Sequence, residues 1–205
     1  MRKINRNNPP EEFVRLVTGS SRPENWDEFV LNYHDLYHQI RGQLLKEQEG
    51  MSGYTEKPLS QEGAIHIDHF RKKGMFDGVE FDWLNFIVDE KDNVNYGAGY
   101  KDCHIKEEDY AKIIHPVIES PSVYLTYMED GTIIARRDLT DQAKRDKADF
   151  TINIFNLNHP ALKKHRCDLI CAVRAYVSGS LEKKDVEDAL ACCGFKSVID
   201  YVYGE

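Results

Sequence analysis

The stretch at residues 65–74, IHIDHFRKKG, constrains the fold more than any other part of the chain. Apolar and polar residues alternate from Ile65 to His69, as they do in a half-buried β-strand. A second apolar run, FDWLNFIVDE, ends in the polar turn DEKDN and predicts a strand over Phe81–Val88. The segment NYGAGYKDCHI that follows is expected to be helical in part, although its glycines weaken a helix. These segments predict a strand–strand–helix unit.

The other elements are expected to be mostly helical. A long helix is predicted over Pro23–Glu49, because apolar residues recur there at steps of three and four. The segment SVYLTYMEDGTIIARR predicts a β-hairpin that turns at Asp130-Gly131. Helices are expected again after the hairpin, the last over Leu181–Cys192 and closed by Gly194. The predicted fold class is therefore α+β, in a single domain over residues 1–205.

Composition excludes several classes of protein. The chain has 205 residues, of which 41% are hydrophobic and 30% charged, so a soluble globular fold is expected rather than a disordered chain. No apolar run approaches the ~20 residues of a membrane span, and MRKINRNNPPEEF lacks the apolar core of a signal peptide, so a cytoplasmic location is expected. The net charge of −8 argues against a chain that is basic overall, although a local basic patch can still bind nucleic acid.

Cysteine usage predicts no disulfide framework. The five cysteines form no CxxC pair, and no secretory signal is expected. Cys167 and Cys171 stand one helical turn apart in HRCDLICAV, a spacing that can ligate a metal. We expect them instead to be two small buried side chains.

The polar residues in and after the first strand suit phosphodiester hydrolysis. This reaction needs an activated water, charge stabilisation at phosphorus and protonation of the leaving oxygen. His69 can take the proton of the water, and Asp68 can hold a Mg²⁺ that binds the scissile phosphate. Asn85 can orient the histidine. The basic residues that follow the strand can neutralise flanking phosphates: Arg71, Lys72 and Lys73. A strand, a loop, a second strand with an asparagine and then a short helix form the layout of a ββα-metal nuclease finger.

The same stretch also has a structural interpretation. Neighbours on an ideal strand point to opposite faces, so Asp68 and His69 share a site only if the strand ends or bulges there. A buried histidine bonded to an aspartate is a common structural unit, and His66 is expected to be a structural neighbour on the face of Asp68. His34 and His38 have metal-ligand spacing on a helix, but without a third ligand nearby they are expected to be surface residues.

Seven motifs, in order along the chain, resemble one family of small HNH nucleases. They are MRKINR, LLKEQEG, GYTEKPL, IDHFRKK, DWLNFIVD, YGAGYKD and NLNHPALKKHR. The family includes the effectors of Septu-type antiphage systems and retron-associated effectors (PtuB-like). The resemblance implies a ββα-metal (HNH) finger over 51–110. It is set in a mostly helical frame made of an N-terminal helical region (1–50) and a hairpin with C-terminal helices (111–205).

The resemblance also implies roles and partners. His69 would be the general base, Asn85 the central asparagine, and Asp68 a ligand of a single catalytic Mg²⁺ or Mn²⁺. Candidates for the second metal ligand follow the second strand: Asp102 first, with Asn95 and His104 behind it. The chain would cut DNA, or structured RNA such as tRNA, as the effector of an antiphage defence complex. Its implied partners are a PtuA-like ATPase subunit of the AAA/ABC type and a retron reverse transcriptase with its DNA–RNA product. No membrane partner is expected.

The chain departs from the family at four cysteine positions. Family members read GLCAYCE where this chain reads GMSGYTE, so Ser52 and Thr55 replace two cysteines, and a second CxxC pair has no counterpart here. Because a structural Zn²⁺ needs about four good ligands, we expect a finger without structural zinc. His159 and Arg166 resemble family positions outside the finger and are expected to anchor the frame or a partner surface. The departure leaves a second hypothesis open: a degenerate HNH fold that binds nucleic acid or a partner without cutting.

Overall fold

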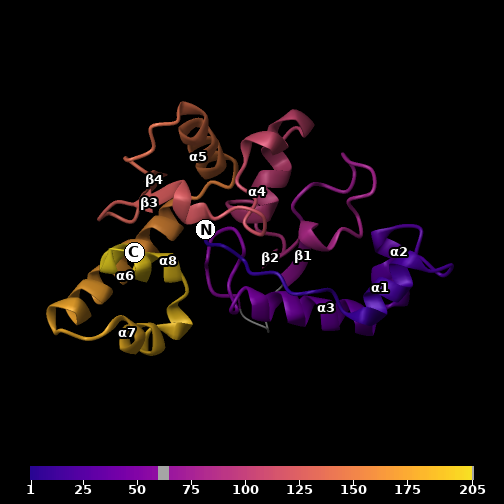
Figure 1. The fold of residues 1–205 in the computed structure, drawn as a ribbon, viewed down its shortest axis with the longest axis horizontal. Helices are drawn as coiled ribbons and strands as arrows, with labels where there is room; N and C mark the ends of the chain where they lie inside the picture. Colours follow the sequence, from indigo (N-terminus) through magenta and orange to yellow (C-terminus); the bar gives the residue numbers. More distant parts are fainter. Residues whose placement is uncertain (60–64, 205) are drawn as a thin grey trace.

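The computed structural model describes residues 1–59 and 65–204 (Figure 1). It has the predicted α+β class, with two small antiparallel sheets among helices. The helices are α1 (Glu11–Thr18), α2 (Trp26–Asn32), α3 (His34–Glu47), α4 (Gly97–His104), α5 (Gln142–Ile154), α6 (Pro160–Ser178), α7 (Lys183–Ala189) and α8 (Lys196–Tyr203). The strands are β1 (Ile65–His69), β2 (Phe86–Glu90), β3 (Leu125–Tyr127) and β4 (Ile133–Ala135). Within the described residues, no helix is long and apolar enough to span a membrane.

The predicted strand–strand–helix order is present. β1 pairs antiparallel with β2 in one continuous register, from Ile65 opposite Glu90 to His69 opposite Phe86. α3 and α4 both contact β2, and Figure 1 shows the small sheet between these two helices. The second strand starts later than the predicted Phe81, because Trp83–Asn85 forms a short 3₁₀ helix before β2.

The long helix predicted over Pro23–Glu49 is two helices. α2 ends and α3 begins at Tyr33, whose backbone (φ −124°, ψ 44°) leaves the helical region. The break lets Trp26 and Phe29 enter the same hydrophobic cluster as Phe86, while α3 lies along β2. Because both helices turn apolar residues to this cluster, the periodicity runs through the break and the sequence pattern does not show it.

The predicted hairpin is confirmed. β3 pairs antiparallel with β4, and the turn between them contains Gly131 at φ +78°. A Cβ at Gly131 would lie 2.2 Å from the carbonyl oxygen of Lys163 on α6, so the turn packs directly on that helix. Arg166 of α6 is fully buried and donates from Nε to the carbonyl of Gly131 at 2.7 Å. Arg166 therefore joins α6 to the hairpin turn.

The C-terminal region differs from the prediction in two ways. The helix predicted over Leu181–Cys192 is the shorter α7 followed by a 3₁₀ helix, Ala191–Cys193, and α8 was not predicted. Gly194 lies at φ +70°, a conformation that suits the predicted stop. Cys167 is only half-buried on α6 and Cys171 is exposed, so the prediction that both are buried is wrong.

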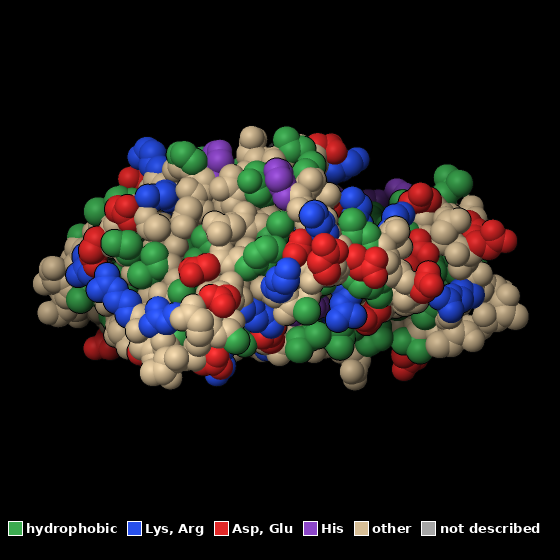
Figure 2. All heavy atoms as spheres, turned by 90° about the horizontal axis from the view of Figure 1, so that it is seen from above, with side chains coloured by type: hydrophobic (Ala, Val, Ile, Leu, Met, Phe, Trp, Pro, Cys, Tyr) green, Lys and Arg blue, Asp and Glu red, His purple; other side chains and the backbone are tan. Residues whose placement is uncertain are grey.

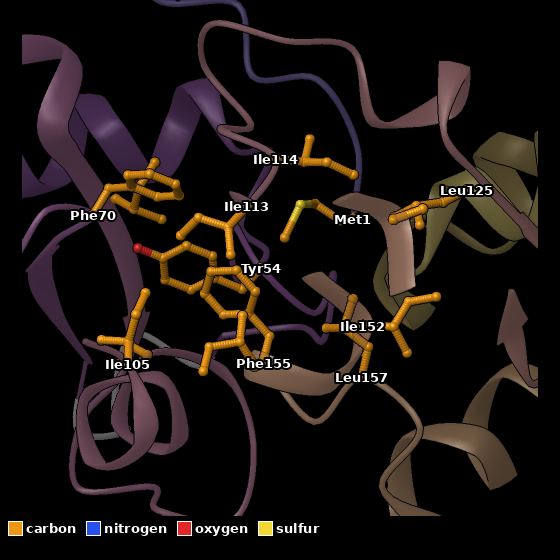
Figure 3. Packing of buried hydrophobic residues seen from close by; sticks show 14 of the residues in the cluster. Met1, Tyr54, Phe70, Ile105, Ile113, Ile114, Leu125, Ile152, Phe155 and Leu157 are labelled. Carbon is orange, nitrogen blue, oxygen red and sulfur yellow. The ribbon is translucent and has the colours of Figure 1, made fainter. Parts of the chain in front are cut away.

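Hydrophobic clusters cover the β1–β2 sheet on both faces. Ile67 and Val88 belong to the cluster formed with α1, α2 and α3. Ile87, which lies opposite Asp68 in the register, belongs to a second cluster that continues through Phe155 into the C-terminal half (Figure 3). A third cluster joins α6, α7 and α8. The sheet is therefore an interior element, in which the polar side chains of Asp68, His69 and Asp89 are buried.

Candidate functional site

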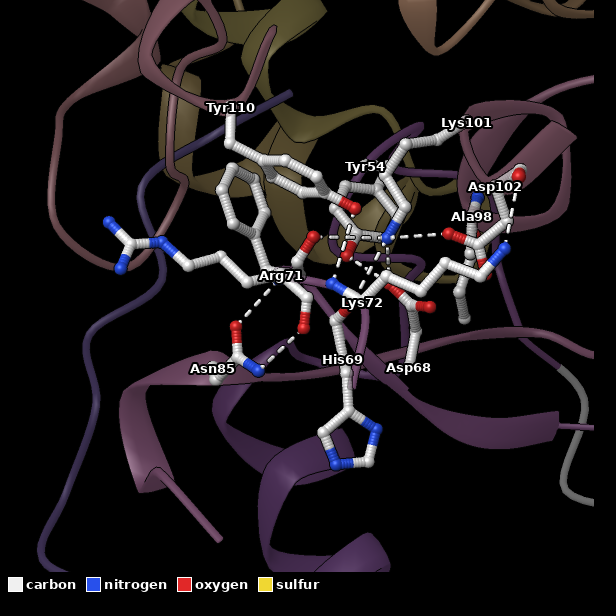
Figure 4. Close-up of polar contacts among 12 residues, drawn as sticks. Tyr54, Asp68, His69, Arg71, Lys72, Asn85, Ala98, Lys101, Asp102 and Tyr110 are labelled. Carbon is white, nitrogen blue, oxygen red and sulfur yellow. Dashed lines mark hydrogen bonds and ion pairs between the residues drawn. The ribbon is translucent and has the colours of Figure 1, made fainter. Parts of the chain in front are cut away.

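Asn85 ties the loop between the two strands to the sheet. Its Oδ1 accepts from the amide of Arg71 at 2.7 Å. Its Nδ2 donates to the carbonyl oxygens of Arg71 at 3.0 Å and Val79 at 3.1 Å (Figure 4). The backbone carbonyl of Asn85 also accepts from the amide of Phe70 at 2.8 Å. Asn85 thus holds the backbone after β1 rather than the ring of His69.

The ring of His69 lies on the face of the sheet opposite to Asp68. β1 keeps a regular antiparallel register with β2 through both residues and ends at His69, so the two side chains point to opposite faces of the sheet. The ring packs edge-on against Trp26, with centroids 4.7 Å apart, and its Nε2 lies 2.9 Å from the carbonyl oxygen of Glu80. Burial lowers the pKa of His69. Figure 4 shows the ring pointing away from the carboxylate.

The carboxylate of Asp68 is held by the ammonium of Lys101, from α4. Nζ of Lys101 donates to Oδ2 of Asp68 at 2.7 Å, and to the carbonyl oxygens of His69 at 3.1 Å and Phe70 at 3.2 Å. The hydroxyl of Tyr54 donates to the same Oδ2. Lys101 is 0% exposed and Asp68 is 5% exposed. The pair therefore forms a buried, hydrogen-bonded ion pair within the strand–strand–helix unit.

Electrostatics keep this ammonium charged. Burial acts to lower the pKa of Lys101, but the carboxylates of Asp68 and Asp102 outweigh it and raise the pKa above its ordinary value. Oδ1 of Asp102 lies 3.3 Å from Nζ of Lys101. Burial raises the pKa of Asp102, with a further contribution from the charge of Asp68. Two carboxylates thus share one ammonium.

The residues present do not fit the catalytic divalent ion that the resemblance implies. The ammonium of Lys101 stands between Asp68 and Asp102, the first two candidate ligands. Asn95 and His104 are both exposed, and His104 stacks on Tyr100 and bonds to its carbonyl; within the described residues, neither side chain bonds to Asp68. Over residues 1–59 and 65–204, no group of three or more histidine, cysteine or carboxylate side chains could hold a metal ion.

The basic run after β1 is largely engaged by other groups of the protein. It comprises Arg71, Lys72 and Lys73. The ammonium of Lys72 donates to the carbonyl of Asp102 at 3.3 Å, and that of Lys73 pairs with Asp27 at 2.6 Å. The guanidinium of Arg71 lies over the ring of Phe76 but is exposed. Only part of the run is therefore placed to meet a phosphate.

The two positions where the family has cysteine form a hydrogen-bonded turn. Oγ of Ser52 accepts from the amides of Tyr54 at 3.3 Å and Thr55 at 3.1 Å. Tyr54 is fully buried and stacks on Phe155, with ring centroids 4.5 Å apart. The turn thus delivers the phenol that contacts Asp68.

Two histidines singled out in the sequence lie at the edges of this arrangement. His66 is half-buried on β1, and within the described residues its Nδ1 has no hydrogen-bond partner. His159 caps α6 by accepting from the amide of Ala161 at 3.3 Å, and its ring packs against Tyr96. His159 thus serves the frame.

Sequence reasoning missed Lys101, the residue that defines this site. Its position is set by Asp89, whose Oδ2 accepts from the amide of Ala98 at 2.7 Å and so fixes the first turn of α4 against β2. Gly97 starts the helix at φ +73°, and a Cβ there would lie 2.5 Å from the Asp89 carboxylate. An acidic residue at the end of a strand, followed by glycine, could have marked where α4 starts, but it does not show which helical residue contacts Asp68.

Comparison with known proteins adds no relative to this picture. No protein-family model matches the chain, and no curated protein matches it. The function is therefore argued from the contacts described above.

Proposed function

We propose that the strand–strand–helix unit is a protein-binding module without hydrolytic chemistry, and that the chain acts as a non-catalytic subunit of a larger assembly. The observation that carries this proposal is the buried ion pair between Lys101 and Asp68. The nuclease hypothesis needs this carboxylate for Mg²⁺ or Mn²⁺, and here an ammonium holds it.

The ammonium of Lys101 has the surroundings of a bound cation. Oxygen atoms of Asp68, Asp102 and two backbone carbonyls lie within 3.3 Å of Nζ. Hard divalent cations prefer such oxygen ligands, so a metal and the lysine compete for one place. A metal at this carboxylate must displace the ammonium and leave that charge buried without its partner, which is costly.

The position of His69 supports the same conclusion. A general base must come within about 3 Å of the water it activates, directly or through one further water. The ring of His69 lies in the aromatic cluster with Trp26 and Phe86, on the other side of the sheet from Asp68. A water held at Asp68 would be separated from this ring by the strand itself.

The distribution of charge favours a protein partner over nucleic acid. The net charge is −8, and two of the three cations of the run after β1 bond to other groups of the protein. On the face drawn in Figure 2, basic side chains are interspersed with acidic ones. Proteins that bind nucleic acid gather their cations on one face. The resemblance supplies the class of partner, an ATPase subunit.

The test is a cleavage assay combined with a binding assay. Wild type and His69→Ala are co-expressed with an ATPase encoded beside the gene, and each complex is purified by a tag on the ATPase. Circular dichroism confirms that both are folded. We expect both forms to co-purify with the ATPase, and neither to cut plasmid DNA or total tRNA in Mg²⁺ or Mn²⁺. Cleavage by wild type that a folded His69→Ala lacks would overturn the proposal.

A metal-dependent HNH endonuclease is the second candidate. The observation that favours it is the order β1–β2–α4 together with Asn85, which holds the loop after β1 through three side-chain hydrogen bonds. This candidate requires Lys101 to leave Asp68 and His69 to turn out of its cluster when nucleic acid binds. The cleavage assay above separates the two candidates.

A further inference from the structure

We propose that His34 and His38 form a surface binding site for a borderline divalent cation of the Ni²⁺, Cu²⁺ or Zn²⁺ class. The site lies on α3, outside the strand–strand–helix unit. It does not depend on the function proposed for that unit.

The two rings are placed by the first turn of α3. His34 opens the helix and His38 follows one turn later, so both side chains share one face. Both side chains are exposed. Their Nε2 atoms lie 2.9 Å apart, and the ring centroids are 4.2 Å apart. Two nitrogen ligands therefore converge at a place open to solvent.

The separation of the nitrogens matches a chelate. Imidazole nitrogens bind such metals at about 2.0–2.1 Å, so two of them at a right angle around one ion lie about 2.9 Å apart. This is the arrangement of neighbouring ligands in the tetragonal or octahedral sites of Cu²⁺ and Ni²⁺. Around a tetrahedral Zn²⁺ the two nitrogens lie about 3.3 Å apart, so the two rings would have to move slightly apart. Mg²⁺ and Mn²⁺ prefer oxygen ligands and are expected to bind poorly.

The surroundings favour a cation in place of the shared proton. Without a metal, one Nε2–H donates to the other Nε2, so at least one ring is neutral. The carboxylate of Asp35 lies 4.0 Å from Nδ1 of His34 and adds attraction for a cation.

The ion would also brace the start of α3. The residue before the helix, Tyr33, provides no side-chain cap for its first amides. A metal bound by both rings ties the first two turns together and leaves its other coordination positions to water or to a partner side chain. Binding should therefore raise the melting temperature as well as produce heat.

The experiment is a Ni²⁺ titration of the full chain by calorimetry, with melting temperatures at each metal concentration. The variants are His34→Ala, His38→Ala and, as a matched control, His165→Ala, which removes another exposed helical histidine. The parent and all three variants also carry Cys167→Ser and Cys171→Ser, so that the two thiols of α6 cannot act as ligands. We expect one Ni²⁺ per chain, bound at least about tenfold more weakly in either of the first two variants and unchanged in the control.

Two results would overturn the proposal. One is a Ni²⁺ affinity in His34→Ala and His38→Ala equal to that of the parent. The other is binding that disappears with the cysteines and is indifferent to both histidines. Circular dichroism on each variant ensures that a lost site is not a lost helix.

Discussion

At the scale of single residues, Lys101 determines what Asp68 can do. A buried carboxylate needs a partner, because an isolated charge in the interior is costly. In this chain the partner is an ammonium from α4, supported by the hydroxyl of Tyr54. The carboxylate is thereby part of the structure that holds α4 to β1, and its two closest contacts are hydrogen-bond donors.

Removing the ammonium alone should destabilise the protein strongly. Lys101→Met leaves Asp68 buried without its counter-ion, and we expect the free energy of unfolding to fall by about 3–5 kcal/mol. The double variant Asp68→Asn/Lys101→Met removes both charges and should recover part of this loss. Urea unfolding of the wild type, both single variants and the double variant measures the coupling. Strictly additive losses would mean that the two side chains do not stabilise one another.

Asn85 should stabilise the folded protein, whether or not it also serves a functional site. Asn85→Ala leaves the amide of Arg71 and the carbonyls of Arg71 and Val79 without their partner, which should cost about 3 kcal/mol. Asn85→Asp keeps an acceptor for the amide but loses both donors, so it serves as the matched comparison. Hydrogen exchange at Arg71 should speed up in Asn85→Ala and less in Asn85→Asp. Unchanged exchange in both would show that this bond does not hold the loop.

Some of these residue contacts were readable from the sequence and others were not. The alternation of a strand already places Asp68 and His69 on opposite faces, and the regular β1 has that arrangement. The nuclease hypothesis required the strand to end or bulge there; β1 ends at His69 but keeps its regular register up to that residue, so the opposite-face arrangement remains. Lys101 was out of reach, because its contact with Asp68 joins a helix to a strand 33 residues away. Local periodicity carries no information on such pairs.

At the scale of elements, local turn signals predicted the secondary structure well, whereas long apolar patterns predicted its boundaries poorly. Asp130-Gly131 identified the β3–β4 hairpin, because the positive φ of Gly131 is a local requirement. The pattern over Pro23–Glu49 could not reveal the break at Tyr33, since α2 and α3 supply one and the same cluster. The apolar run after Phe81 could not separate a 3₁₀ helix from the strand that follows it.

Two glycines give predictions of opposite sign. Gly131→Ala puts a Cβ against α6 at a φ of +78°, so we expect a loss of at least about 1–3 kcal/mol in unfolding free energy. Gly42 lies within α3, and a Cβ there meets no atom within 4 Å. Gly42→Ala should therefore stabilise the protein by about 1 kcal/mol. Chemical denaturation of both variants is the measurement, and equal signs would contradict the packing described for the hairpin.

At the scale of the whole molecule, the β1–β2 sheet is the junction of two cores. α1, α2 and α3 cover one face, and the other face continues through Tyr54 and Phe155 into the C-terminal half. Figure 1 shows the sheet near the middle of an elongated molecule. A site on such a sheet is enclosed from both sides, which is why its charged groups pair with each other.

His115 should make the stability of the whole molecule fall in acid. It is 8% exposed beside Phe70, and burial, aided by the charge of Arg71, lowers its pKa to about 4. The unfolded chain takes up a proton near pH 6.5 and the folded chain does not, so stability falls as pH drops from about 6.5 to 4. The loss attributable to His115 should reach about 3 kcal/mol at pH 4. His115→Asn removes this contribution while retaining a polar side chain. Urea unfolding of both proteins across this range should give curves that diverge in acid; parallel curves would rule the effect out.

The most direct test of the central claim is a calorimetric Mn²⁺ titration of wild type and Asp68→Asn. His34→Ala and His38→Ala are introduced into both proteins beforehand, so that metal binding on α3 contributes no heat. If Lys101 holds the carboxylate, the two titrations should be the same, with no binding that depends on Asp68. A Mn²⁺ site that is present in the wild type and lost in a folded Asp68→Asn would contradict the account and support the nuclease.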